Sequence, residues 1–84
     1  MTVVTFKTKT EVFGFLNECR KRGMGASAVA MPKELKIGCG LAVQIFSGHA
    51  HQALLLINQG YFPTFNGIYS VKKQAGKSSL TRIY

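Results

Sequence analysis

Apolar and polar residues follow one another along this chain in two kinds of pattern, one typical of strands and one typical of helices. The β-branched and aromatic run at residues 2–6, TVVTF, predicts a buried strand. In residues 9–22 the apolar side chains recur at helical spacing: Val12, Phe15, Leu16 and Cys19. Thr8 followed by Glu11 is the pattern of a capping box, and Gly23 is a typical helix stop. These signals predict a helix over residues 9–22.

The rest of the chain divides into short apolar runs separated by turn residues. The predicted elements are a strand at 26–31, a polar loop at 32–38, a strand at 40–46, a helix after Gly48, a turn at 63–67, a strand at 67–73 and a loop at 74–79. The second helix keeps the 3.6-residue period through Ala50, Ala53, Leu54, Ile57 and Tyr61, with Gly60 as its stop. Residues 80–84 are either an added edge strand or a loose tail.

The predicted order β-α-β-β-α-β indicates the α+β class. Its usual packing is a ferredoxin-like sandwich, a four-stranded antiparallel sheet with both helices on one face. With right-handed crossovers, three connections meet at one end of the sheet: residues 7–10, 32–40 and 62–67. A chain of 84 residues is expected to form a single domain over 1–75, followed by a basic C-terminal extension, 76–84.

Composition narrows the function classes. The chain has 11 Lys and Arg against 3 acids, a net charge of +8, which indicates an anionic partner. The basic residues fall in four separate places, so nucleic-acid binding is expected to be only weak or non-specific. With so few acids, a paired-carboxylate enzyme or a catalytic triad is nearly excluded. The hydrophobic fraction of 46% is high for a small monomer, which suggests a homodimer interface.

The N-terminus lacks the features of a signal peptide, and no apolar run has the roughly 20 residues of a membrane span. We therefore expect a cytoplasmic protein, with no membrane partner and with both thiols free. His49 and His51 lie two residues apart, on different faces of a helix, without a third ligand in view. No metal site and no cofactor are expected.

The strongest chemical signal is Cys39, which stands between Gly38 and Gly40 at the end of a basic loop. Flanking glycines leave the sulfur unshielded and allow a sharp turn. Lys33 and Lys36 place positive charge nearby, which favours the nucleophilic thiolate. The predicted topology also brings this loop to the N-terminus of the first helix, where the helix dipole favours an anion. Cys19, by contrast, is expected to pack in the core.

Two stretches of the chain, TFKTKTE and MPKELKIGCGLAV, resemble the selenium/sulfur (Se/S) carrier protein-like family. The matching residues are Thr5, Phe6, Thr8, Thr10, Pro32, Lys33, Cys39, Gly40, Leu41 and Ala42. The resemblance implies that Cys39 accepts sulfur or selenium. Lys33 stands where the family is expected to have Arg, and the basic tail has no counterpart in the family pattern.

The residues and the resemblance together predict a thiol carrier, more a non-enzymatic carrier than a turnover enzyme. Cys39 is the reactive group, and its partners are sulfur or selenium donor and acceptor proteins. The residues expected to stabilise the anion are Lys33, Lys36, Thr8, Thr10, Gly38 and Gly40. The alternative is a small basic binding module that contacts RNA or an acidic protein, with Cys39 structural. In that case the aromatic residues near the last turn would stack on bases; otherwise they pack at the edge of the core or on a dimer face. They are Tyr61, Phe62, Phe65 and Tyr69.

Overall fold

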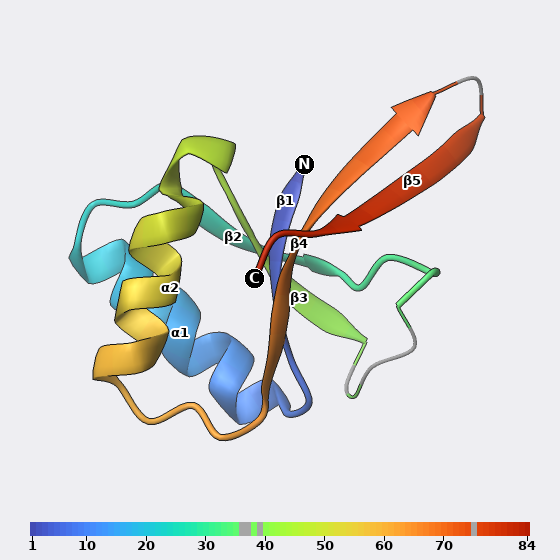
Figure 1. Ribbon diagram of the computed structural model, residues 1–84. Coiled ribbons are helices and arrows are strands. Elements are labelled where there is room, and N and C mark those ends of the chain that lie inside the picture. The colour runs from blue at the N-terminus through green and yellow to red at the C-terminus, as the bar shows by residue number, and fades with distance from the viewer. Residues whose placement is uncertain (36–37, 39, 75) are drawn as a thin grey trace.

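Within the residues that the computed structural model describes, 1–35, 38, 40–74 and 76–84, the chain forms five strands, two α-helices and one short 3-10 helix. In chain order these are β1 (Thr2–Phe6), α1 (Lys9–Lys21), β2 (Ala26–Ala30), β3 (Leu41–Ile45), η1 (Ser47–His49), α2 (Ala50–Gln59), β4 (Phe65–Gln74) and β5 (Lys77–Arg82). Figure 1 shows both helices on one side of a single twisted sheet. The α+β class and the two helices agree with the sequence prediction.

The strands form one sheet in the order β2-β3-β1-β4-β5, and every neighbouring pair is antiparallel. β1 is central, with Val4 opposite Val43 on one side and opposite Ile68 on the other. The prediction of a four-stranded ferredoxin-like sandwich is therefore not matched in strand number. The added edge strand is present, but it runs over Lys77–Arg82 and not over residues 80–84.

The local signals for α1 act largely as the sequence predicted, although the helix ends at Lys21 and the Glu11 carboxylate binds Thr64 instead of completing a capping box. Thr8 is the N-cap, and its hydroxyl accepts a hydrogen bond from the N–H of Glu11 at 3.4 Å. The helix buries one stripe of side chains, Val12, Phe15, Leu16 and Cys19. Gly23 follows with φ of +72°, the left-handed conformation that glycine adopts most easily after a helix.

The main core lies between the sheet and the two helices. Alternate residues of the central strands point toward the helices, among them Val4, Phe6, Val43 and Ile68. Phe6 contacts three aromatic rings, those of Phe15, Phe62 and Phe65, with centroids 5.3, 5.5 and 6.0 Å apart. The expectation that Phe62 and Phe65 pack against the core is confirmed. Tyr61, expected on the apolar face of α2, lies beyond the end of that helix and is 86% exposed.

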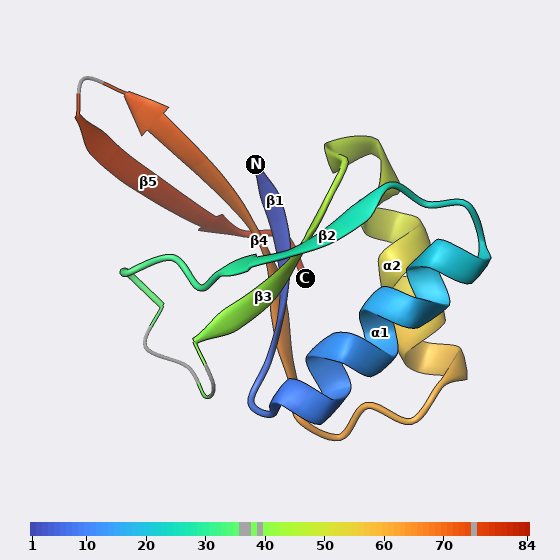
Figure 2. The same ribbon diagram turned by 180° about the vertical axis from the view of Figure 1, so that it is seen from behind.

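The other face of the sheet carries no helix, and we call it the open face. It holds a second, smaller cluster: Val3, Ala42 and Val71 are buried, with Val29, Met31, Tyr69 and Leu80 packed around them. Figure 2 shows the loop after β2 and the β4–β5 hairpin extending to this side, away from the helices. Tyr69 lies here beneath the guanidinium of Arg82, which is 6.0 Å from its ring centroid.

The loop predicted at residues 74–79 is instead the tip of the β4–β5 hairpin. Strand pairing reaches Gln74 and Lys77, and Gly76 turns the chain with φ of +78°. The polar sequence of residues 77–79 concealed the strand, because an edge strand can pair through its backbone without an apolar pattern.

Candidate functional site

The candidate site is the end of the sheet where three connections meet. The β1–α1 turn is joined to the α2–β4 connection by the N–H of Lys7, which donates to the carbonyl oxygen of Thr64 at 3.1 Å. The carboxylate of Glu11 accepts the N–H of Thr64 at 3.0 Å. The first turn of α1 is thus anchored to a segment 53 residues away. The capping pattern identified Glu11, but its partner lies beyond the reach of local sequence patterns.

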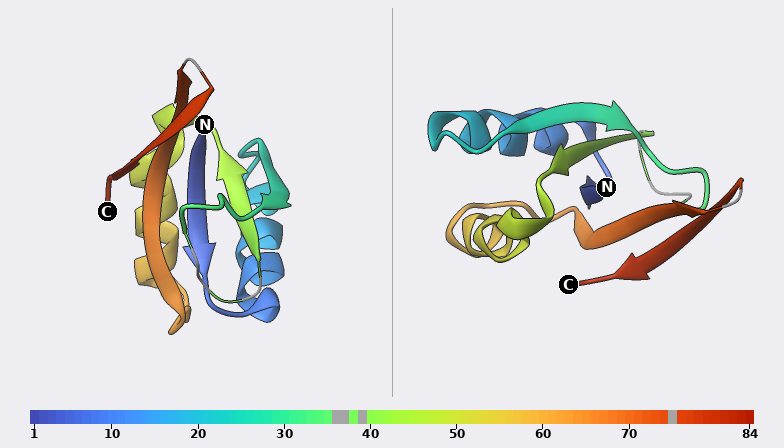
Figure 3. Two further views of the ribbon diagram at one scale, coloured as in Figure 1. Left: turned by 90° about the vertical axis from the view of Figure 1, so that its right-hand side faces the viewer. Right: turned by 90° about the horizontal axis from the view of Figure 1, so that it is seen from above.

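The third connection is the β2–β3 loop (residues 31–40), and Gly38 brings it to the same end. A Cβ atom at position 38 would collide with the backbone of Lys7, and φ is +57°. Both the close approach and the left-handed backbone require glycine. Gly38 therefore lies directly against the β1–α1 turn. That turn lies at the lower end of the sheet in Figure 1 and in the left view of Figure 3. This agrees with the expectation that the three connections meet.

Gly40 has a different part in the loop. Its φ is +78°, yet among the described residues, its chain neighbours aside, nothing lies within 4 Å of the position that a Cβ would occupy. Its carbonyl oxygen accepts the N–H of Met31 at 2.8 Å, which closes the base of the loop. The two glycines beside Cys39 are consequently not equivalent: one permits a close contact, and the other permits only a turn in open space.

The predicted site residues Thr8 and Thr10 lie at the start of α1 and are exposed. The first N–H groups of a helix have no partner within the helix, and the dipole gives this end a partial positive charge. Glu11 lies in the same turn, and its negative charge offsets part of that field. The positive potential at this end of α1 is therefore smaller than the helix dipole alone would give.

Lys33 lies elsewhere. It is exposed in a turn closed by the N–H of Leu35, which donates to the carbonyl oxygen of Pro32 at 2.9 Å. With Met1, Met31 and Val71 it lines a shallow hollow of about 310 Å³. The structure therefore brings Gly38 to the start of α1 but places Lys33 beside different residues. Cys39 and Lys36 lie outside the described residues, so the site is defined here by the neighbours of Cys39.

Cys19 lies in the core of the domain. Its side chain is fully buried among the core residues of α1 and the sheet. Burial raises the pKa of the Cys19 thiol to about 11, because a thiolate loses its hydration there; Arg22 offsets a smaller part of this shift. The prediction that Cys19 is a core residue is confirmed.

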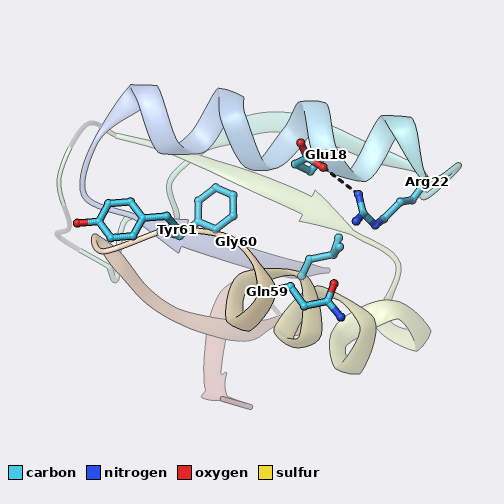
Figure 4. A pocket seen from close by; sticks show the side chains of 7 residues that line it. Glu18, Arg22, Gln59, Gly60 and Tyr61 are labelled. Atoms are coloured by element: carbon cyan, nitrogen blue, oxygen red, sulfur yellow. Dashed lines mark hydrogen bonds and ion pairs between the residues drawn. The ribbon is translucent and has the colours of Figure 1, made fainter.

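A second hollow, the interhelical pocket, lies between α1 and the end of α2 and has a volume of about 290 Å³. Figure 4 shows the Glu18–Arg22 ion pair on one wall and Gln59 on the other, with Tyr61 directed away. Nη1 of Arg22 lies 2.8 Å from Oε2 of Glu18. Sequence reasoning missed this pocket; the i,i+4 charge pair was its only local signal. Its lining holds no cysteine, so it is not a site for thiol chemistry.

The two histidines do not face a common point. His49 precedes α2, its ring packs edge-on against Phe46 with centroids 5.9 Å apart, and its Nδ1 is buried without a hydrogen-bond partner. His51 is exposed on α2. Among the described residues, no three His, Cys, Asp or Glu side chains are close enough to hold a metal ion. The described helices are too short or too polar to cross a bilayer.

Comparison with known proteins identifies one family. A family model described as "Putative Se/S carrier protein-like" matches residues 1–69. The match includes both helices, the β2–β3 loop and the first part of β4, and it ends before β5. No curated protein and no solved structure matches the chain.

Proposed function

Because the chain belongs to the Se/S carrier protein-like family, we propose that it is a thiol carrier that accepts sulfur or selenium on Cys39 and passes it to a partner protein. The observation that carries the proposal is the geometry of the neighbouring glycine. Gly38 lies against the β1–α1 turn and so ties the residue before Cys39 to the start of α1. A buried structural cysteine has no need of such a loop.

The chemistry is thiol exchange with a donor persulfide. The Cys39 thiolate attacks the outer sulfur of the donor, a new S–S bond forms, and the donor S–S bond breaks. The electron pair leaves with the donor sulfur as a thiolate, so no external oxidant or reductant is needed. A donor that carries selenium in the outer position reacts in the same way. Transfer to the acceptor is the same exchange with the acceptor thiolate as nucleophile.

The surrounding residues have distinct roles in this proposal. The N–H groups at Thr8 to Thr10 stabilise the anionic adduct, and Glu11 limits how strongly. Lys33 and Lys36 belong to the same loop and add positive charge to it, although Lys33 itself lies in the hollow beside Met31 and not at the start of α1. A domain of this size buries too little surface to build a deep active-site cleft as well, which suits a protein that docks to larger enzymes in the cytoplasm rather than one that turns over its own substrate. We further propose that residues 1–75 form one ferredoxin-like domain. It consists of the first four strands and both helices, and β5 extends its sheet.

The test is adduct formation on the reduced protein, with glutathione persulfide as donor and intact-mass spectrometry as readout. We expect one added sulfur atom on the wild-type protein and on Cys19→Ala, and none on Cys39→Ser. Native-state alkylation should likewise modify Cys39 and spare Cys19. An adduct that survives in Cys39→Ser, or a wild-type protein that takes up no sulfur, contradicts the proposal.

A further inference from the structure

The two edges of the sheet are differently protected. The β5 edge carries the charged residue Arg82, and charge on an edge strand discourages pairing with another strand. The β2 edge has the sequence ASAVA, with no charge and no proline, and Ala28 and Ala30 are exposed. Figure 3, left, shows β2 as the outermost strand on the side of α1. An uncharged, regular edge of this kind is a template for an added strand.

The hydrogen-bond pattern shows which backbone groups of β2 are open. Met31 donates its N–H to the carbonyl oxygen of Gly40 at 2.8 Å, so the backbone N–H and C=O groups of Met31 point toward β3 and not toward the edge of the sheet. Backbone direction alternates along a strand, so Val29 also faces β3, while Ala28 and Ala30 direct their N–H and C=O groups outward. Within the described chain these outward groups have no strand beside them. We call this row of groups the free edge of β2.

Helix α1 adds a specific surface above this edge. Glu18 and Arg22 line the interhelical pocket, so that side of α1 faces α2. By the 100° step of a helix, the opposite side carries Lys9, Phe13 and Arg20, which we call the α1 flank. Since α1 packs over β2 and β3, this flank lies above the free edge. Phe13 is 50% exposed there.

The charge of the α1 flank indicates the occupant. The ion pairs of α1 join Glu18 to Lys21 and to Arg22, and in the described structure neither Lys9 nor Arg20 has an acidic partner. A second copy of this chain, paired through β2 about a two-fold axis, would place these flanks against each other, and their like charges would repel. An acidic strand meets no such penalty.

We propose that the free edge of β2 docks an extended acidic segment of a partner protein, which pairs with β2 as an additional strand. Lys9 and Arg20 are eleven residues apart, or about 16 Å along the helix, and four residues of a strand span about 13 Å. Residues i, i+2 and i+4 of a strand share one face. The segment therefore has acidic residues at i and i+4 and an apolar residue at i+2, which packs on Phe13. The proposal goes beyond the carrier function and does not depend on it.

The test uses an end-capped, fluorescently labelled peptide, Thr-Glu-Thr-Leu-Thr-Glu-Thr, with a control in which Lys replaces Glu. Binding to the full chain is measured by anisotropy, and amide exchange locates the contact. We expect the acidic peptide to bind, to protect the amides of Ala28 and Ala30 and to leave the β5 amides unchanged. Binding should be the same in Cys39→Ser, so failure here and failure of the carrier function are separate results.

Two matched pairs of variants test the geometry. Ala28→Pro removes an outward donor and should weaken binding by about tenfold, the ratio for one lost hydrogen bond, whereas Ala28→Val keeps the donor and should bind as the wild type does. Arg20→Glu and Arg22→Glu change the net charge equally, but only Arg20→Glu should weaken binding. Equal loss in both arginine variants, tight binding of the Lys peptide, or protection confined to β5 overturns the proposal. A wild-type dimer that Ala28→Pro converts to monomer also overturns it, in favour of a second copy.

Discussion

At the scale of single residues, the two glycines beside Cys39 show how the same residue type serves different physical needs. Both have positive φ, +57° at Gly38 and +78° at Gly40. Only Gly38 also has a neighbour, the Lys7 backbone, in the space of a side chain. A side chain at position 38 is therefore disfavoured both by the clash with Lys7 and by the left-handed backbone, whereas at position 40 only the left-handed backbone disfavours it.

Alanine at the two positions should separate these contributions. Gly40→Ala is expected to lower the free energy of unfolding by about 1–2 kcal/mol, the cost of a left-handed residue with a Cβ. Gly38→Ala should cost more, because the loop must also move away from Lys7. Urea unfolding measures both, and Cys39 alkylation should change more in Gly38→Ala. Equal costs would mean that the contact with Lys7 is not maintained.

The buried thiol of Cys19 makes stability depend on pH in the alkaline range. Its pKa is raised to about 11 in the folded protein, while the unfolded thiol titrates near its ordinary value. Between these two pKa values the thiol is protonated in the folded state and ionised in the unfolded state. The thiol's contribution to the free energy of unfolding is therefore fully present below the unfolded-state pKa and is lost as pH rises toward the folded-state pKa. The slope contributed by this thiol is up to about 1.4 kcal/mol per pH unit. Cys19→Ala is the control and should lack this contribution; an identical alkaline decline in both proteins contradicts the prediction.

At the scale of elements, the junction between α1 and the α2–β4 connection depends on one carboxylate. Glu11 accepts the Thr64 N–H at 3.0 and 3.2 Å with its two oxygens, in a partly buried setting. Glu18 belongs to the same helix, but its ion pairs are exposed. The two glutamates therefore differ in how much the fold depends on them.

Replacing each glutamate by alanine should show that difference. Glu11→Ala leaves a backbone donor without its partner and should cost about 1–3 kcal/mol. Glu18→Ala removes only exposed ion pairs and should cost less than about 1 kcal/mol. Thermal or urea unfolding measures both variants. A larger loss for Glu18→Ala would show that the charge pair, not the Thr64 contact, holds the helices in place.

At the scale of the whole molecule, the excess of positive charge is distributed over separate elements. Arg20 lies on α1, Lys33 lies in the β2–β3 loop, and Arg82 lies on β5. A nucleic-acid reader generally gathers such residues on one face. We therefore expect the charge to serve docking of acidic proteins, and not recognition of a nucleic-acid sequence.

RNA binding should accordingly be weak and should collapse with salt. Each phosphate neutralised contributes about one unit to the slope of log affinity against log salt. Filter binding between low and physiological salt measures the slope, with RNAs of different sequence as controls for selectivity. Tight, sequence-selective binding at physiological salt would instead support the binding-module alternative.

Local sequence was enough to determine α1 with its Thr8 cap, the burial of Cys19 and the buried strand β1, because these depend on neighbours within about one helical turn or strand. The order of elements was also enough to bring three connections to one end of the sheet. Tertiary structure alone decided that Gly38 lies against Lys7, that Glu11 binds Thr64 and that Lys33 lies beside Met1 and Val71. It also decided that polar residues 77–79 form a strand. The first three share one physical reason: each contact joins segments far apart in the chain, and strand pairing and twist, which no local pattern contains, set which segments meet. Residues 77–79 instead pair with the neighbouring strand of a hairpin, and they do so through backbone hydrogen bonds that an apolar pattern does not reveal.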